Sequence, residues 1–290
     1  MASLKVIRKR IVSVRNTQQV TKAMKMVSAA KLRRAQAAAE SARSYSDKLT
    51  ELLRGLASAE EGEAPHPFLR PGSDAPAQLI VITGDKGLCG AYNASIIRMA
   101  TAFLAEERGR GATLTVIGRR AREFFAKRAP DSIVAEHVGV TPDLALARAI
   151  GRHAAERFVA GEAGEVYVVY TRFRSAISQI PTLDRLLPLR DEAATEATPQ
   201  QGIGRDYVYE PDPRSILDSL LPRYIETRIY HAMLESAASE HGARMTAMDS
   251  ATRNASEMIG RLTLAMNRAR QAGITTELME IVGGAEALKG

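Results

Sequence analysis

The sequence predicts an α/β domain inserted between two long helices, which pair as an antiparallel coiled coil. Three observations predict this fold class. Neither proline nor glycine occurs between Ser3 and about Gly55, apolar residues recur at steps of three and four near both ends of the chain, and short apolar strands alternate with helices between them. Each terminal helix is too long for a small domain to bury, so the two helices are expected to pack on each other.

Residues 1–57 are predicted to form the first coiled-coil helix, because alanine, lysine, arginine, glutamine and methionine favour helix. At ~1.5 Å per residue this helix is roughly 80 Å long. Two successive three-residue steps, at Val14, Thr17 and Val20, predict a stammer that locally overwinds the coiled coil. The predicted seam consists of Leu4, Ile7, Ile11, Val14, Thr17, Val20, Met24 and Val27, followed by Ala38, Ala42, Tyr45, Leu49, Leu52 and Leu56.

Residues 58–77 combine prolines, glycines and acids, which indicates a surface linker. A Rossmann-like, doubly wound α/β domain is predicted over residues 78–190, because its strands and helices alternate as they do in a parallel sheet. A second polar linker follows at 191–208. The predicted strands are Leu79–Ile82, Leu114–Ile117, Ile133–His137 and Glu165–Phe173, the last of which closes the series, and the predicted helices are Ala91–Glu107, Arg119–Arg128 and Pro142–Val159.

Residues 209–290 return to helix from Pro213 to about Leu288, and Pro222 and Gly242 are candidate bends. Small residues dominate its seam, so two helix axes can approach closely while little apolar area is buried per turn. The predicted seam positions are Tyr230, Leu234, Ala237, His241, Arg244, Met248, Ala251, Ala255, Met258, Leu262, Ala265, Ala269 and Ala272.

The basic balance of the chain belongs to one segment. The net charge is +7, from 40 Lys and Arg against 33 Asp and Glu in 290 residues. Residues 1–39 hold ten basic residues and no acidic one, so the remainder is slightly acidic. The single cysteine excludes an internal disulfide. No apolar run approaches the ~20 residues that span a bilayer, and a signal peptide is not expected because the N-terminus has no apolar core region.

The central domain offers one candidate ligand site, the turn from Gly84 to Gly90. Glycines permit close approach of a phosphate, and helix N-termini attract anions. The turn matches neither GxxxxGK[ST] nor GxGxxG, so a structural turn is favoured over a nucleotide site. Cys89 is either a nucleophile or, as we favour, a small buried thiol. The five histidines have no metal-ligand spacing, so neither a metal nor another cofactor is expected.

The basic N-terminal helix has three interpretations: a nucleic-acid arm, a membrane-surface helix, or a helix that faces an acidic protein surface. Aromatic residues for base stacking are absent before Tyr45, which disfavours the first. Threonine, glutamine and alanine on the apolar face disfavour strong membrane burial. The third interpretation explains why ten like charges occur together despite their mutual repulsion.

Several motifs resemble those of the gamma-subunit family of F-type ATP synthases, over essentially the whole chain. They are IRKRIVSVRNTQQVTKAMKMVSAAKLRRAQ near the N-terminus, ITGDKGLCGAYN, SQIPTLDRLLPL and YVYEPDPRSILDSLLPRY in the middle, and RMTAMDSATRNASEMIGRLTLAMNRARQAGITTELMEIVGGAEAL at the C-terminus. The resemblance implies that the two terminal helices form a coiled coil inside a hexamer of alpha and beta subunits.

The resemblance also implies contact residues, none of them catalytic. Lys22, Met24 and Lys25 match the helix face opposite an acidic lever loop of the beta subunit. A second set, on the C-terminal helix, matches positions that bond to a beta catch loop. A third set matches the foot that rests on the c-ring. The second set is Arg270, Gln271 and Thr275. The third set is Tyr209 and Glu210.

As a member of this family the chain is expected to be one rotary copy per complex, which couples proton flow to ATP synthesis and regulates ATP hydrolysis. Its implied partners are the alpha and beta subunits, the epsilon subunit and the c-ring of Fo, with no nucleic acid and no direct membrane insertion. The implied location is peripheral, on the cytoplasmic side of the bacterial inner membrane. A nucleotide-dependent enzyme built on the α/β domain is the alternative.

Overall fold

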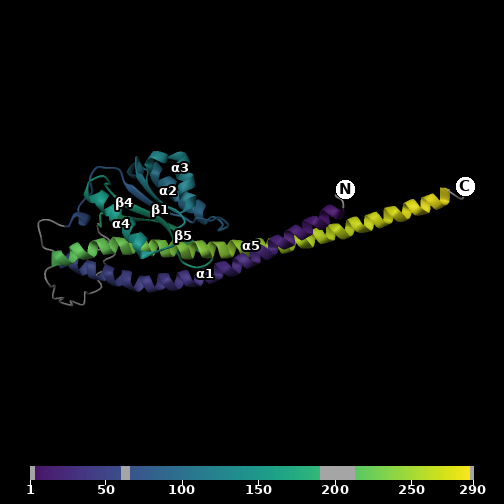
Figure 1. Ribbon diagram of the computed structural model, residues 1–290, viewed down its shortest axis with the longest axis horizontal. Helices are drawn as coiled ribbons and strands as arrows, with labels where there is room; N and C mark the ends of the chain where they lie inside the picture. The colour runs from purple at the N-terminus through teal and green to yellow at the C-terminus, as the bar shows by residue number, and fades with distance from the viewer. Residues whose placement is uncertain (1–3, 60–65, 190–212, 288–290) are drawn as a thin grey trace. The chain divides into compact units, whose positions relative to one another are not determined.

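The computed structural model describes residues 4–59, 66–189 and 213–287 (Figure 1). By internal packing the chain divides into two units, each described by itself: the terminal unit, Met1–Ser28 with Met245–Gly290, and the central unit, Ala29–Arg244. The long helices α1 (Leu4–Ala59) and α5 (Pro213–Ala287) contribute to both. Among the helices described, none is both long and apolar enough to cross a membrane.

In the terminal unit, α1 and α5 pack antiparallel, as predicted. Three side-chain contacts establish the direction, because the residue number rises on one helix as it falls on the other: Gln18 with Ser256, Thr21 with Thr252, and Lys25 with Asp249. Continuing this register places Leu4 opposite Arg270, so α5 extends beyond the first described residue of α1 (Figure 1).

In the central unit, five strands form one sheet in the order β3-β2-β1-β4-β5. The strands are β1 (Gln78–Ile82), β2 (Thr113–Ile117), β3 (Ile133–His137), β4 (Val166–Phe173) and β5 (Gln179–Leu187). The first four are mutually parallel, and β5 pairs antiparallel with β4. The crossover helices are α2 (Tyr92–Ala105), α3 (Arg119–Arg128) and α4 (Leu144–Val159), so the doubly wound architecture is confirmed.

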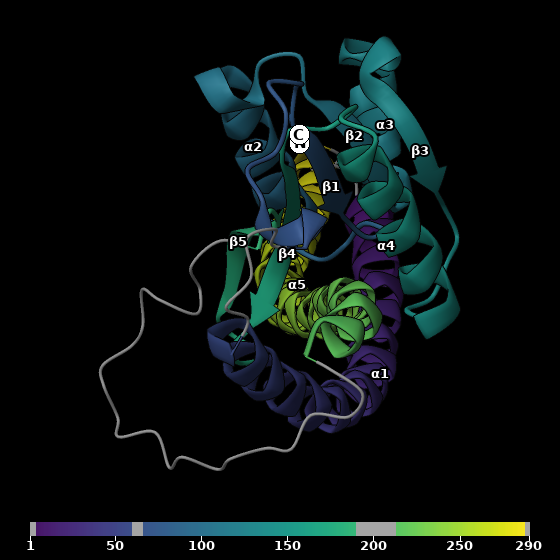
Figure 2. The same ribbon diagram turned by 90° about the vertical axis from the view of Figure 1, so that its left-hand side faces the viewer.

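Alternate residues of β1 face opposite sides of the sheet, and both sides are buried, as parallel sheets require. Leu79 and Val81 pack with α2 and α3. Ile80 and Ile82 pack with α4 and with the first part of α5, whose buried residues on this side include Leu221 and Ile229. Figure 2 shows the sheet lying between these layers. A segment distant in the sequence therefore acts as one of the covering helices.

The prediction that the strand series closes at Phe173 is wrong, because β5 follows it. Pro181 disfavours a strand at this position in the sequence, but an edge strand tolerates proline on its unpaired side. The linker predicted at 58–77 also differs in detail: α1 continues to Ala59, and Phe68 is buried against Phe158. The second linker, 191–208, and the seam side chains of Tyr45, Leu52 and Leu56 lie outside the described part of the chain.

Candidate functional site

The seam of α1 in the terminal unit is a regular series with steps of four and three. Its positions, all buried or half-buried, are Ile7, Ile11, Val14, Gln18, Thr21, Lys25 and Ser28. The predicted stammer is therefore wrong, because Thr17, Val20 and Val27 are exposed, the two valines at 57%. The predicted series left the observed seam after Val14, whereas in the structure the polar residues Gln18, Thr21 and Lys25 continue it, each with a polar partner on α5.

These polar contacts form three successive layers, which we call the polar ladder. Gln18 Nε2 donates to Ser256 Oγ at 2.6 Å. The hydroxyls of Thr21 and Thr252 lie 2.8 Å apart. Lys25 Nζ lies 2.5 Å from Asp249 Oδ1. Polar seam positions specify register and orientation at a cost in stability, so the ladder defines which layers of the two helices meet.

The seam of α5 follows Met248, Thr252, Ala255, Ile259, Leu262 and Met266, all buried or half-buried. The predictions at Met248, Ala255 and Leu262 are confirmed, whereas those at Met258 and Ala265 are wrong, since both residues are exposed. The steps alternate in the opposite order to the one predicted. Because alanines and methionines lie on both faces of this helix, the predicted and the observed series of seam positions are equally apolar in the sequence.

The three predicted contact residues of α1 lie in different environments. Lys22 is exposed, and Met24 is half-buried beside the seam. Lys25 is held within the helical pair by Asp249, with 45% and 35% of the two side chains exposed. The hydrogen bond from Lys25, and the charges of Lys25 and Arg253, hold the pKa of Asp249 below its ordinary value. Lys22 therefore presents a more available charge than Lys25.

The predicted contact residues of α5 occupy the stretch that begins opposite Leu4. Arg270, Gln271 and Thr275 are all exposed, and the Thr275 hydroxyl donates to the Gln271 carbonyl at 3.0 Å. The structure does not bring them to Lys22, which lies at the level of Thr252. Tyr209 and Glu210 lie outside the described residues.

Large apolar side chains of the terminal unit are left about half exposed or more. On α1 and α5 they are Val6, Val12, Val20, Met26 and Val27, and Met258, Leu264, Ile274, Leu278, Met279, Ile281 and Val282. Exposed apolar surface of this extent marks a site of association. Together with exposed basic residues such as Lys22, these side chains make the terminal unit the candidate partner-binding surface.

The candidate nucleotide turn is satisfied by its own protein neighbours. The Gly84 N–H donates to Asn93 Oδ1 at 2.9 Å, and Asp85 Oδ1 accepts the Arg119 N–H at the start of α3 at 2.8 Å. Asp85 therefore caps the N-terminus of α3 and places a carboxylate within the turn, where it would repel a phosphate.

The crevice at the carboxyl ends of β1 and β4, where doubly wound folds bind ligands, is covered by α5. Ser239 Oγ donates to the Thr171 carbonyl at 3.1 Å. A β-carbon on Gly84 would lie 2.7 Å from the carboxylate carbon of Glu240. A nucleotide phosphate would meet this carboxylate, so the geometry disfavours the enzyme alternative.

Cys89 lies in the same turn and is buried. Burial raises the pKa of its thiol, while the nearby Arg244 opposes the shift. A raised pKa keeps the sulfur as the thiol, which is the weaker nucleophile. The environment therefore favours the structural role over the nucleophilic one.

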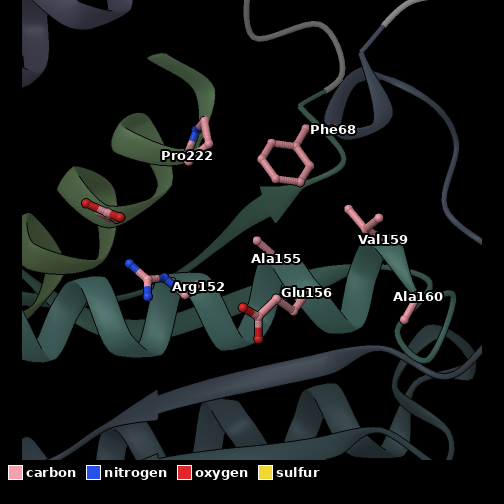
Figure 3. Close-up of a pocket in the computed structure, with 9 residues that line it drawn as sticks. Phe68, Arg152, Ala155, Glu156, Val159, Ala160 and Pro222 are labelled. Carbon is pink, nitrogen blue, oxygen red and sulfur yellow. The ribbon is translucent and has the colours of Figure 1, made fainter. Parts of the chain in front are cut away.

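A shallow groove of about 520 Å³ lies between α4, Phe68 and Pro222 (Figure 3). Its polar lining consists of Arg152, Glu156 and Glu226. Two carboxylates beside one guanidinium do not suit a phosphate ligand. In the described residues, no cluster of histidine, cysteine or acidic side chains is arranged to hold a metal.

The environment of His241 predicts that the stability of the central unit depends on pH. Burial lowers its pKa below the ordinary value of about 6.5, Glu240 opposes the shift, and Arg244 and Lys31 reinforce it. The unfolded chain then binds more protons, so this contribution to stability is complete above about pH 6.5 and is lost as the pH falls through the folded pKa. We expect the melting temperature, measured by circular dichroism, to drop less between pH 7.5 and 5.5 in His241→Gln than in wild type; equal drops would refute this.

Sequence reasoning missed Gln18, Thr21, Thr252, Asp249 and Ser256, because it placed the two seams in a different register, set mainly by apolar residues. The available signal was that polar residues continue the rhythm of Ile7, Ile11 and Val14 without interruption. It also missed the contacts of Glu240 with the central domain, since no local pattern links α5 to a turn more than a hundred residues earlier.

A family model described as ATP synthase matches residues 3–288. The ATP synthase gamma chain of Geobacter metallireducens is 49% identical over 294 residues, covering 100% of both chains, and that of Moorella thermoacetica is 48% identical over 292 residues with the same coverage. A chain from the central stalk and c-ring of Tetrahymena thermophila mitochondrial ATP synthase has a TM-score of 0.62 and 26% identity, covering 80% of this chain and 99% of that one. A chain from the Euglena gracilis mitochondrial enzyme shares the fold, with a TM-score of 0.67 and 18% identity, covering 98% and 94%.

Proposed function

This chain belongs to the ATP synthase gamma-chain family and is a rotary central-stalk subunit, and from that premise we propose that its terminal unit turns inside a hexamer of alpha and beta subunits. The observation that carries the proposal is the exposed apolar surface of the terminal unit. Met26 on α1 and Leu278 and Met279 on α5 are more than half exposed, although each helix has a separate buried seam. These side chains require a surrounding partner to leave water.

The basic residues support an acidic lining around α1. Of the ten basic residues in 1–39, all but Lys25 are exposed. An acidic lever loop of beta is the partner we propose for Lys22, Met24 and Lys25, and a catch loop of beta for Arg270, Gln271 and Thr275. Complementary charge across such an interface favours correct docking and discourages wrong partners.

The asymmetry of a single helical pair supplies a coupling mechanism. One pair cannot contact three identical beta subunits in the same way, so it stabilises a different nucleotide affinity in each. Rotation then exchanges those affinities among the subunits. Each proton that crosses the membrane supplies ~2.3 kcal/mol per 100 mV, so several protons are needed per ATP. The rotor must therefore sum the free energy of successive protons. We also propose that ATP chemistry takes place on the beta subunits and that this chain regulates ATP hydrolysis.

The remaining proposed partners are the c-ring and the epsilon subunit. We propose that Tyr209 and Glu210 rest on polar loops of the c-ring, with the epsilon subunit beside the α/β domain. This arrangement places the chain peripherally, on the cytoplasmic side of the bacterial inner membrane, without membrane insertion and without nucleic acid. Steeply salt-dependent DNA binding by the assembled complex would support the nucleic-acid interpretation instead.

Native mass spectrometry of the complex tests the proposal most directly. We expect one copy of this chain with three copies each of two larger subunits. A different ratio, or a chain that does not co-purify with them, would contradict the rotor assignment.

Calorimetry separates the rotor from the enzyme alternative. The isolated chain is expected to show no stoichiometric binding of ATP or a dinucleotide, because the Glu240 carboxylate lies against Gly84 and Asp85 adds a second carboxylate to the same turn, and both would repel a phosphate. Tight one-to-one binding would support the alternative. A useful variant is Glu240→Gln, which removes the carboxylate nearest Gly84 and shows whether charge alone excludes the ligand.

A further inference from the structure

A buried arginine of α5 holds a loop of the α/β domain within the central unit. Arg244 Nε and Nη2 donate to the Gly87 carbonyl at 3.3 and 3.2 Å, and Nη2 also reaches the Lys86 carbonyl at 3.4 Å. The same guanidinium pairs with Glu240 at 2.5 Å and lies 3.4 Å from His241 Nδ1. Only 10% of the Arg244 side chain is exposed.

The loop it holds is strained. Leu88 has a φ of 62° although its side chain is largely exposed. A bulky residue in the left-handed region is unfavourable and persists only where the surroundings hold it. The two carbonyls bound by Arg244 immediately precede Leu88, and Asn93 Nδ2 also donates to the Lys86 carbonyl, at 3.3 Å. Arg244 and Asn93 thus both hold the loop.

Arginine suits this position better than lysine does. Its planar fork reaches two successive carbonyls and a carboxylate at once, whereas the lysine ammonium is a compact donor. Glu240 neutralises the buried guanidinium, and Gly84 leaves room for that carboxylate. The ion pair of Arg244 and Glu240 therefore contacts the loop and is largely shielded from solvent.

The position along α5 indicates what the contact does. The hydrophobic core holds α5 to the sheet from Leu217 to Met233. Arg244 lies eleven residues further, roughly 16 Å along the helix axis. Between them, Ser236 and Ser239 of α5 bond to the backbone of Thr171, so Arg244 adds an attachment beyond these and opposes pivoting of the α/β domain about the core contact.

We propose that Arg244 is a positioning residue of the rotor, which clamps the loop at Lys86 and Gly87 to α5 so that the α/β domain and α5 turn together. This inference rests on the proposed rotary function. Without the clamp, part of the torque that passes between the domain and the helix displaces the loop instead of turning α5. Arg244 acts through the loop and touches no reacting group.

The test uses the whole complex in inverted membrane vesicles and compares Arg244→Gln with Arg148→Gln. Arg148 of α4 also bridges the α/β domain to α5, through Glu226 at 3.1 Å, but its side chain is 52% exposed. Cys89, the only cysteine of the chain, reports loop release through its alkylation rate, read by mass spectrometry of its peptide. ATP hydrolysis and ATP-driven proton pumping are measured on the same vesicles.

In Arg244→Gln we expect Cys89 alkylation to rise about tenfold or more, the effect of losing a charged hydrogen bond. Pumping per ATP hydrolysed is expected to fall about two-fold or more. Arg148→Gln should match wild type in both. If Arg244→Gln does not assemble, Arg244→Lys replaces it and should give an intermediate alkylation rate.

A protected Cys89 with full coupling in Arg244→Gln overturns the proposal. So does the same rise in both variants, which would indicate general loosening of the domain, and so does unchanged alkylation in Arg244→Lys. Failure of the rotary function itself has a different signature: vesicles that lack this chain would still couple ATP hydrolysis to pumping.

Discussion

Reversing the charge of Lys22 is expected to reduce ATP-driven proton pumping several-fold while helix content stays close to wild type. Lys22 is exposed on α1, so glutamate there meets the proposed acidic loop of beta as a like charge, which disfavours close approach. The helix itself tolerates glutamate almost as well as lysine. Fluorescence quenching in inverted vesicles measures pumping, and circular dichroism of the isolated chain measures folding. The double variant Lys22→Glu/Lys25→Glu should lose more coupling than folding.

Lys25 provides the contrast, because its charge is engaged by Asp249 across the polar ladder. Lys25→Glu places two carboxylates together and should loosen the helical pair. If Lys25 acts only within the pair, Lys25→Glu/Asp249→Lys restores pumping. If it also contacts beta, the swapped pair restores folding but not pumping. Unchanged pumping in both Lys22→Glu and the double-glutamate variant would count against the proposed contact.

Truncating Ile229 to alanine is expected to lower the free energy of unfolding of the central unit by about 2–5 kcal/mol. Ile229 of α5 is fully buried in the core formed with β1, β4 and α4. Removing its side chain leaves a cavity where α5 serves as a covering helix of the sheet. Hydrogen exchange of the full chain, read by mass spectrometry in peptides from β1 and β4, locates the loss.

Ile274 offers a matched control on the same helix, because its side chain is 50% exposed. Ile274→Ala should change the free energy of unfolding by no more than about 0.5 kcal/mol. Equal protection of β1 and β4 in Ile229→Ala and wild type would mean that α5 is dispensable to the sheet. In that case the α/β domain would be an independent body attached to the helix.

Much of the fold was accessible from local patterns. Helix α3 and strand β3 were predicted with the bounds the structure has, and β1, β2 and β4 within one residue. Apolar runs of four to eight residues between turn signals identify buried parallel strands, and the absence of proline and glycine identifies α1. Strand β5 escaped because it is an edge strand with proline inside and no alternation to mark it.

The candidate site was less accessible. The family motifs pointed to Lys22, Arg270, Gln271 and Thr275, and the structure finds all four exposed. The same motifs pointed to Lys25, but only the pairing of α1 with α5 shows that Lys25 forms an ion pair with Asp249. Whether a polar residue faces solvent or a partner helix depends on which residue lies opposite, and periodicity on one helix does not contain that information.

By itself, the sequence determined two long helices around an α/β domain, a basic first helix and membership of a family. These follow from composition and local periodicity, which act within a few turns or strands. Only the tertiary structure decided the phase of the two seams, the covering of the sheet by α5 and the contacts of Arg244 with Lys86 and Gly87. Each of these joins residues distant in the chain, and their free energy exists only once both segments are folded together.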